Sequence, residues 1–262
     1  MAERKPIPGK FVWYELQCTG VAKAQAFYAE LLAWKNVPFP AGNTTYEMIF
    51  AGETPDTMIG GYAPLREGET RGSRWIASVS VEDVDAVARA AAANGGTIVQ
   101  APHDVPGAGR GARIADPGGA ELSLIKSTRG DPPDVEAAPT GSFFWNELHT
   151  TDPAAALAFY EKTVGFTHET MKSPAGDYHV ISRGGIGRGG VTGHLPPGVA
   201  PHWLPYVHVA DVDASAARAQ RLGGQIVLPP MDIPDIGRST VVRDTVGAVV
   251  ALMKPNPRMS KR

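Results

Sequence analysis

The sequence contains little cysteine and no long apolar segment. Cys18 is the only cysteine among 262 residues, so neither an intrachain disulfide nor a cysteine-rich zinc site can form. No run approaches the ~18 apolar residues that a membrane-spanning helix requires. The opening residues, MAERKPIPGK, lack the apolar core of a signal peptide. Together these absences predict a cytoplasmic protein without a membrane partner.

An excess of charge of either sign is also lacking. The formal net charge is -2, so the sequence lacks the excess of positive charge that binding to nucleic acid requires. The strings GxxxxGK[ST], HExxH and GxSxG do not occur. GIGRGG at 185–190 matches the dinucleotide pattern GxGxxG, but the following VTGHLPPG cannot begin a helix, so we interpret it as a glycine-rich hairpin. The expected partner is therefore a small-molecule ligand or substrate, bound by a monomer or a homodimer.

Glycine and proline are abundant, and the chain repeats itself. The 30 glycines and 23 prolines indicate many short elements joined by turns. FVWYELQCTG at 11–20 aligns with FFWNELHTTD at 143–152, and WIASVSVEDVDA at 75–86 aligns with WLPYVHVADVDA at 203–214. A repeat of this length indicates a duplicated architecture. We expect a tail at 1–10, a first half at 11–126, a linker at 127–141, a second half at 142–254 and a tail at 255–262.

A fainter repeat divides each half into two modules. In the first module, alternation predicts a strand at 11–17, helical spacing predicts a helix at 21–34, and short strands follow at 45–50 and 58–62. The same order restarts at Trp75, so the unit βαβββ occurs four times. The fold class is therefore α+β, in which each pair of modules forms a curved sheet cup with helices outside. The sequence leaves open whether modules pair 1–2 with 3–4 or 1–4 with 2–3.

These motifs resemble the vicinal oxygen chelate superfamily, which includes glyoxalase I, bleomycin-resistance proteins and extradiol dioxygenases. The resemblance is carried by WxEL at 13–16 and 145–148, the Phe-Tyr pairs at 27–28 and 159–160, the VEDVDA and VADVDA strings, and DPGGAELSLI from Asp116. It covers nearly the whole chain, and two-half glyoxalase-like proteins of actinobacteria, often labelled hydroxylases, are the most similar group. It implies the fold rather than one activity.

The resemblance also implies where a divalent metal would bind. Metal-dependent members place His, Gln or Glu at positions that here hold Trp13, Ile76, Ser123, Trp145, Leu204 and Ala251, with the remaining two near Gly61 and Gly193. None of these side chains supplies the imidazole or carboxylate that such metals need. We therefore expect no metal and no cofactor, with a divalent metal as the alternative.

Strand parity then selects the residues that face into the cup. Trp13, Glu15 and Gln17 share one face in the first half, and Ser78 and Ser80 share the corresponding face of its second module. The equivalent positions of the second half hold Trp145, Glu147, His149, Tyr206 and His208. Histidine and glutamate together can perform general acid–base work near neutral pH. We predict catalysis by Glu147, His149, Tyr206 and His208, and ligand binding by Trp13, Glu15, Gln17, Ser80 and Trp145.

The sequence supports three functional hypotheses. The first is a metal-independent lyase or isomerase that acts on a small organic or aromatic molecule in secondary metabolism. The second is a non-catalytic binding or drug-sequestering resistance protein, for which Trp13 and Trp145 would stack on a planar ligand. The third is a metal-dependent lyase or dioxygenase. Arg110 and Arg238, at matched places after turns, either anchor loops or bind an anionic ligand at the mouth of the cup.

Overall fold

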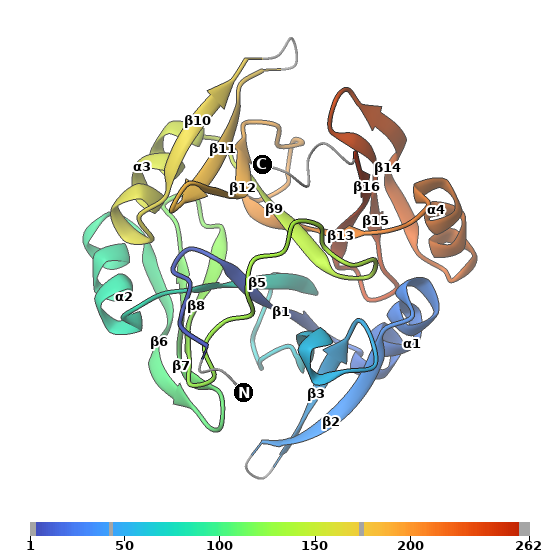
Figure 1. Cartoon of the computed structure of the whole chain (residues 1–262), viewed down its shortest axis with the longest axis horizontal. Coiled ribbons are helices and arrows are strands. Elements are labelled where there is room, and N and C mark those ends of the chain that lie inside the picture. Colours follow the sequence, from blue (N-terminus) through green and yellow to red (C-terminus); the bar gives the residue numbers. More distant parts are fainter. Residues whose placement is uncertain (1–3, 42–43, 173–175, 257–262) are drawn as a thin grey trace. The chain divides into compact units, whose positions relative to one another are not determined.

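The computed structural model describes residues 4–41, 44–172 and 176–256. Its elements repeat the predicted order of strand, helix and three strands four times (Figure 1). The first half contains β1 (Phe11–Cys18), α1 (Val21–Leu32), β2 (Lys35–Ala41), β3 (Thr44–Phe50), the 3-10 helix η1 (Pro55–Thr57), β4 (Met58–Pro64), β5 (Arg74–Ser80), α2 (Val84–Ala93), β6 (Thr97–Val105), β7 (Gly109–Ala115) and β8 (Glu121–Ser127).

The second half repeats these elements without the 3-10 helix. It contains β9 (Phe143–His149), α3 (Pro153–Thr163), β10 (Thr167–Met171), β11 (Tyr178–Arg183), β12 (Ile186–Thr192), β13 (His202–His208), α4 (Val212–Arg221), β14 (Gln225–Ile233), β15 (Gly237–Arg243) and β16 (Val249–Pro255). Within the described ranges, no helix has the length and hydrophobicity to cross a membrane.

Each half forms an open, curved sheet of eight strands, which confirms the predicted fold class. The strand order is β2-β3-β4-β1-β5-β8-β7-β6 in the first half and β10-β11-β12-β9-β13-β16-β15-β14 in the second. In every module the first and last strands pair in parallel, whereas the other pairs are antiparallel. Parallel pairing requires a crossover, and the helix between the first two strands supplies it.

Aspartate caps begin three of the four helices. Asp83, Asp152 and Asp211 each accept a hydrogen bond from the backbone N–H three residues later, at 2.9, 3.0 and 2.9 Å. A side-chain oxygen at this position satisfies a donor that the helix itself leaves unpaired. The VEDVDA, TDPAAA and VADVDA strings therefore start helices because of these caps.

Packing divides the chain into two compact units that do not coincide with the two halves. Unit 1 comprises Met1–Trp13, Ile76–Pro133 and Trp145–Trp203, and unit 2 comprises Tyr14–Trp75, Asp134–Phe144 and Leu204–Arg262. Unit 1 thus contains α2 and α3, and unit 2 contains α1 and α4. Hydrogen bonding therefore joins modules 1–2 and 3–4 into sheets, while compact packing groups modules 2–3 and 1–4.

A buried chain of three polar side chains lies in the core of each unit. In unit 1, Trp203 Nε1 donates to the Tyr160 hydroxyl at 2.9 Å, and that hydroxyl donates to Asp116 Oδ2 at 3.3 Å. In unit 2, Trp75 Nε1 donates to Tyr28 at 3.0 Å, and Tyr28 donates to Asp244 at 2.9 Å. The tyrosines of the Phe-Tyr pairs are therefore core residues. Their hydroxyls are fully satisfied, as burial requires.

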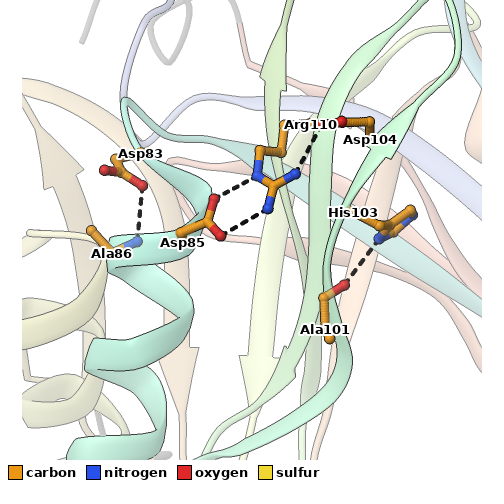
Figure 2. Close-up of polar contacts among 7 residues, drawn as sticks. All are labelled: Asp83, Asp85, Ala86, Ala101, His103, Asp104 and Arg110. Atoms are coloured by element: carbon orange, nitrogen blue, oxygen red, sulfur yellow. Dashed lines mark hydrogen bonds and ion pairs between the residues drawn. The ribbon is translucent and has the colours of Figure 1, made fainter.

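Two arginines clamp helices to hairpins. Arg110 donates to both carboxylate oxygens of Asp85, in the first turn of α2, and to Asp104 of β6 (Figure 2). Arg238 makes the same three bonds to Asp213 and Asp232 in unit 2. The bonds from each arginine lower the pKa of Asp85 and of Asp213. Of the two sequence-based alternatives, these contacts favour anchoring.

The GIGRGG string forms part of a hairpin, as interpreted from the sequence. Strands β11 and β12 pair antiparallel around Gly184 and Gly185. Both glycines have positive φ angles, of 63° and 78°. Consecutive positive φ angles are what a tight two-residue hairpin turn requires, and glycine adopts them without strain.

Candidate functional site

Strand β9 separates its side chains between a buried face and a half-buried face. Asn146 and Leu148 are 2% and 0% exposed, whereas Trp145, Glu147 and His149 on the other face are half-buried. The period of two residues in an extended strand produces this separation. Side chains on the half-buried face are therefore within reach of a ligand while still partly shielded from water.

Glu147 and His149 contact each other on this face. His149 Nε2 lies 2.8 Å from Glu147 Oε1, and both side chains are largely covered, with 16% and 15% exposed. The other ring nitrogen of His149, Nδ1, donates to the His194 carbonyl oxygen at 2.6 Å. Burial alone lowers the pKa of His149, but the contact with Glu147, the charge of that carboxylate and the His194 carbonyl raise it above its ordinary value. The pair therefore favours an imidazolium beside a carboxylate.

Tyr178 and Trp145 extend the pair on its other side. Trp145 Nε1 donates to the Tyr178 hydroxyl at 3.0 Å. Burial and then the charge of Glu147 raise the pKa of Tyr178 far above its ordinary range, and the phenol is hydrogen-bonded to that carboxylate. Because the phenol stays neutral, it donates to Glu147 and fixes the carboxylate in place.

A glycine makes room for this tyrosine. Gly190 of β12 stands opposite Glu147 in the parallel pairing with β9. A Cβ atom at Gly190 would lie only 1.9 Å from the Tyr178 hydroxyl oxygen. The glycine therefore allows the phenol to approach Glu147.

Unit 2 repeats the arrangement of glutamate, tyrosine and glycine, with a glutamine in place of the histidine. Gly61 stands opposite Glu15, a Cβ there would lie 2.4 Å from the Tyr46 ring, and the Tyr46 hydroxyl donates to Glu15 at 3.3 Å. Gln17 takes the place of His149 and donates to Glu15 Oε1 at 2.9 Å. Glutamine cannot carry a proton near neutral pH, so this cluster has hydrogen-bonding groups without the titrating partner.

The remaining predicted residues lie elsewhere. Tyr206, 8% exposed, and His208 belong to unit 2. The His208 Nδ1 atom donates to the Ala138 carbonyl at 2.7 Å, and both rings pack against Phe144. Ser80 is fully buried, while Trp13 is half-buried in unit 1. The structure thus brings together Trp145, Glu147 and His149 in unit 1, and Glu15 with Gln17 in unit 2.

The residues at the family's metal positions do not fit a metal ion. The register places Ser123 opposite Ser78 and Ala251 opposite Tyr206. It also places Gly190 opposite Glu147, and a tyrosine fills the space above that glycine. Across the described parts of the chain, no group of three His, Cys, Asp or Glu side chains is arranged to hold a metal ion.

An open pocket of about 770 Å³ lies near the pair but does not include it. The start of α3, strands β10 and β11 and the turn after β12 line this pocket, which contains His168, His179 and His194. His194 is the residue whose carbonyl holds His149. We therefore place the candidate site at Glu147 and His149, where a carboxylate and an imidazole that are both largely covered lie 2.8 Å apart, and treat the pocket as a neighbouring surface.

Sequence comparison identifies relatives along nearly the whole chain. "Putative glyoxylase CFP32" of Mycobacterium tuberculosis is 38% identical over 255 residues, covering 94% of this chain and 95% of the relative. "Anthracycline biosynthesis protein DauV" of Streptomyces sp. is 30% identical and covers 95% and 96%. The second comparison extends the similarity to a protein named for a biosynthetic pathway.

Solved structures share the fold at low sequence identity. The Mn(II)-bound glyoxalase from Novosphingobium aromaticivorans has a TM-score of 0.63 at 16% identity, covering 95% of this chain and 82% of its own. An extradiol ring-cleaving dioxygenase from B. fuscum has a TM-score of 0.68 at 16% identity, covering 97% and 74%. The family model described as the Glyoxalase/Bleomycin resistance protein/Dioxygenase superfamily matches residues 10–124 and 143–252. The chain therefore belongs to the glyoxalase/bleomycin resistance protein/dioxygenase superfamily.

Proposed function

We propose that this protein is an enzyme that moves a proton on a small organic substrate. In this proposal Glu147 contacts the substrate, and His149 exchanges a proton with Glu147. The observation that carries this proposal is the 2.8 Å contact between Glu147 Oε1 and His149 Nε2 on the half-buried face of β9. A carboxylate and an imidazole in contact can share one proton, and general acid–base catalysis needs such a group within reach of the substrate.

The contacts around the pair support these two roles. His149 Nδ1 donates to the His194 carbonyl, and Nε2 is buried, 2.8 Å from Glu147 Oε1. The carboxylate is therefore the member of the pair that presents itself to a ligand. When Glu147 gives a proton to the substrate, His149 replaces that proton; when Glu147 accepts one, the pair takes on a positive charge.

The proposed substrate is a small molecule whose C–H bond is acidified by a neighbouring carbonyl. Removing such a proton leaves an enolate, whose formation a nearby acid–base pair assists. A relative is named an anthracycline biosynthesis protein, which favours an aromatic ketone among such substrates. The half-buried Trp145 indole, held by Tyr178, offers a flat surface beside Glu147 for an aromatic ring.

Hydrogen–deuterium exchange at carbon tests this proposal without knowledge of the natural substrate. Hydroxyacetone, methylglyoxal and 2-tetralone would each be incubated with the protein in D₂O, and proton NMR would follow loss of the signal next to the carbonyl. We expect the native protein to accelerate exchange of at least one probe, and Glu147→Gln and His149→Gln to lose about 10²–10⁴-fold of that rate.

Glu169→Gln is the matched control, because Glu169 is an exposed carboxylate of β10 in the same unit. It should exchange the probes at the native rate. The proposal fails if the native protein exchanges all three probes no faster than Glu147→Gln does.

A binding function without conversion is the second candidate. It is favoured by the fixed orientation of the Trp145 indole, whose N–H donates to Tyr178 at 3.0 Å. In that case 2-tetralone would quench tryptophan fluorescence and be recovered with its C–H bonds intact. Quenching in both the native protein and Glu147→Gln, without exchange in either, would support binding over catalysis.

A further inference from the structure

A second histidine lies beside the Glu147–His149 pair. The rings of His149 and His202 are nearly parallel, with centroids 5.3 Å apart and planes inclined by 6°. His202 opens strand β13 and belongs to unit 1 with the pair. Both Nδ1 atoms donate to backbone carbonyls, that of His149 to His194 at 2.6 Å and that of His202 to Ala200 at 2.9 Å. Each ring is therefore held in one orientation and one tautomer.

The two rings differ at their other nitrogen. His149 Nε2 faces the Glu147 carboxylate at 2.8 Å. His202 Nε2 has no hydrogen-bond partner within residues 4–41, 44–172 and 176–256. Since Nδ1 of His202 carries the proton that Ala200 accepts, Nε2 carries a lone pair in the neutral ring. One imidazole is thus placed to hold a proton and the adjacent one to accept a proton.

The pKa shifts of the two imidazoles agree with these positions of the proton. Burial lowers the pKa of His202, and the charge of His149 lowers it further, against the opposing effects of the Ala200 carbonyl and Glu147. The pKa of His149 moves upward because Glu147 outweighs its burial. The titratable groups around the two rings are Glu147 on β9, Tyr178 on β11 and His194 in the turn after β12. Neighbouring groups that shift in opposite directions are the usual basis of an acid–base assignment.

We propose that His202 is the catalytic base and the Glu147–His149 pair the catalytic acid of a two-site proton transfer, which makes the reaction an isomerisation of a hydroxy-carbonyl or conjugated carbonyl compound. The proposal rests on the proposed function and names its reaction class. The two imidazole rings are parallel and 5.3 Å apart. Two groups at this spacing can exchange protons with two different atoms on one side of a small molecule.

The proton inventory of this step is balanced. His202 Nε2 takes the proton from the substrate C–H bond, and the bonding electron pair moves into the carbonyl system to give an enolate. The Glu147–His149 pair then delivers one proton to another atom of that enolate and remains as a carboxylate beside a neutral imidazole. The substrate keeps its composition, and proton exchange with solvent returns the two rings to their starting states.

Chemical rescue tests the role of His202. In the deuterium-exchange assay, His202→Ala should lose about 10²–10⁴-fold of the native rate, and imidazole added to the buffer should restore part of it. His103→Ala is the matched control, because His103 Nδ1 also donates to the carbonyl two residues earlier, Ala101 at 3.0 Å (Figure 2). It should retain the native rate and show no response to imidazole.

The unmodified protein provides a measurement that does not depend on folding of a variant. ¹⁵N NMR should show His202 at pH 7 as a neutral ring protonated at Nδ1, and a pH titration should show that His149 loses its proton at higher pH than His202. A protonated His202 at pH 7, or full exchange activity in folded His202→Ala while Glu147→Gln is inactive, would overturn the two-site assignment and leave the proposed function intact. Activity in Glu147→Gln would instead remove the proposed function itself.

Discussion

At the scale of single residues, the charge of His149 depends chiefly on Glu147. Glu147 raises the pKa of this imidazole despite burial. A group whose pKa is raised on folding stabilises the fold below the pKa of the unfolded chain, about 6.5 for histidine, and loses this contribution as the pH rises through the folded value.

We therefore expect Glu147→Gln to destabilise the protein more at pH 6 than at pH 9, because only the imidazolium benefits from the carboxylate. The difference in the free energy of unfolding at pH 6 should be about 1–3 kcal/mol, the range for removing one partner of a buried polar contact. Urea unfolding at the two pH values measures it. An equal effect at both pH values would show that the pair does not hold the proton as described.

The sequence predicted part of this site. Parity along β9 placed Trp145, Glu147 and His149 on one face, but it did not single out Tyr178, His194 or His202. These three residues reach the site through strand pairing, the turn after β12 and ring stacking, none of which is visible as a local pattern. One signal was available: Tyr46 and Tyr178 are separated by the same number of residues as Trp13 and Trp145.

At the scale of elements, the approach of Tyr178 to Glu147 depends on the absence of a side chain at Gly190 of strand β12. Gly190→Ala would place a Cβ 1.9 Å from the Tyr178 hydroxyl, so the phenol or the strand must move. We expect a loss of about 1–3 kcal/mol in the free energy of unfolding, which is typical of overpacking, together with a changed environment of Glu147. Thermal or urea denaturation and the exchange assay would measure the two effects.

Gly193→Ala is the control for this prediction. Its Cβ would meet Pro153 at 3.5 Å, an ordinary van der Waals distance, and its φ angle is not positive. It should unfold within about 0.5 kcal/mol of the native protein, as a substitution without a clash does. If both alanine variants lost the same stability, the close approach of Tyr178 would not be the cause.

Element boundaries were predicted least well where proline intervenes. The segment Lys35–Ala41, which contains Pro38 and Pro40, forms strand β2, although no strand was predicted there. The strand order explains the outcome. β2 is the last strand of its sheet, and an edge strand tolerates proline because its outer N–H groups have no partner in the sheet.

At the scale of the whole molecule, repetition made the fold predictable and the grouping of modules unpredictable. Four βαβββ modules follow from the repeat in the sequence, since each copy carries the same strand and helix signals. Which modules pack together depends on contacts between distant segments, such as Tyr160 with Asp116 and Tyr28 with Asp244. Each of these hydrogen bonds joins the tyrosine of the Phe-Tyr pair in one module to the turn aspartate of another. The motifs that carry the family resemblance therefore also hold each unit together.

Removing these hydroxyls should therefore weaken the two units to a similar extent. Tyr160→Phe and Tyr28→Phe each delete a bond to a buried aspartate and leave a tryptophan N–H without its acceptor. An unsatisfied buried donor costs about 1–3 kcal/mol, and urea unfolding should show a loss of this size for each variant. Tyr62→Phe is the control, because Tyr62 is 2% exposed and its hydroxyl has no hydrogen-bond partner in the described part of the chain. If Tyr62→Phe cost as much as the other two, loss of the hydroxyl from a buried ring, rather than loss of the Trp–Tyr–Asp chain, would explain all three results.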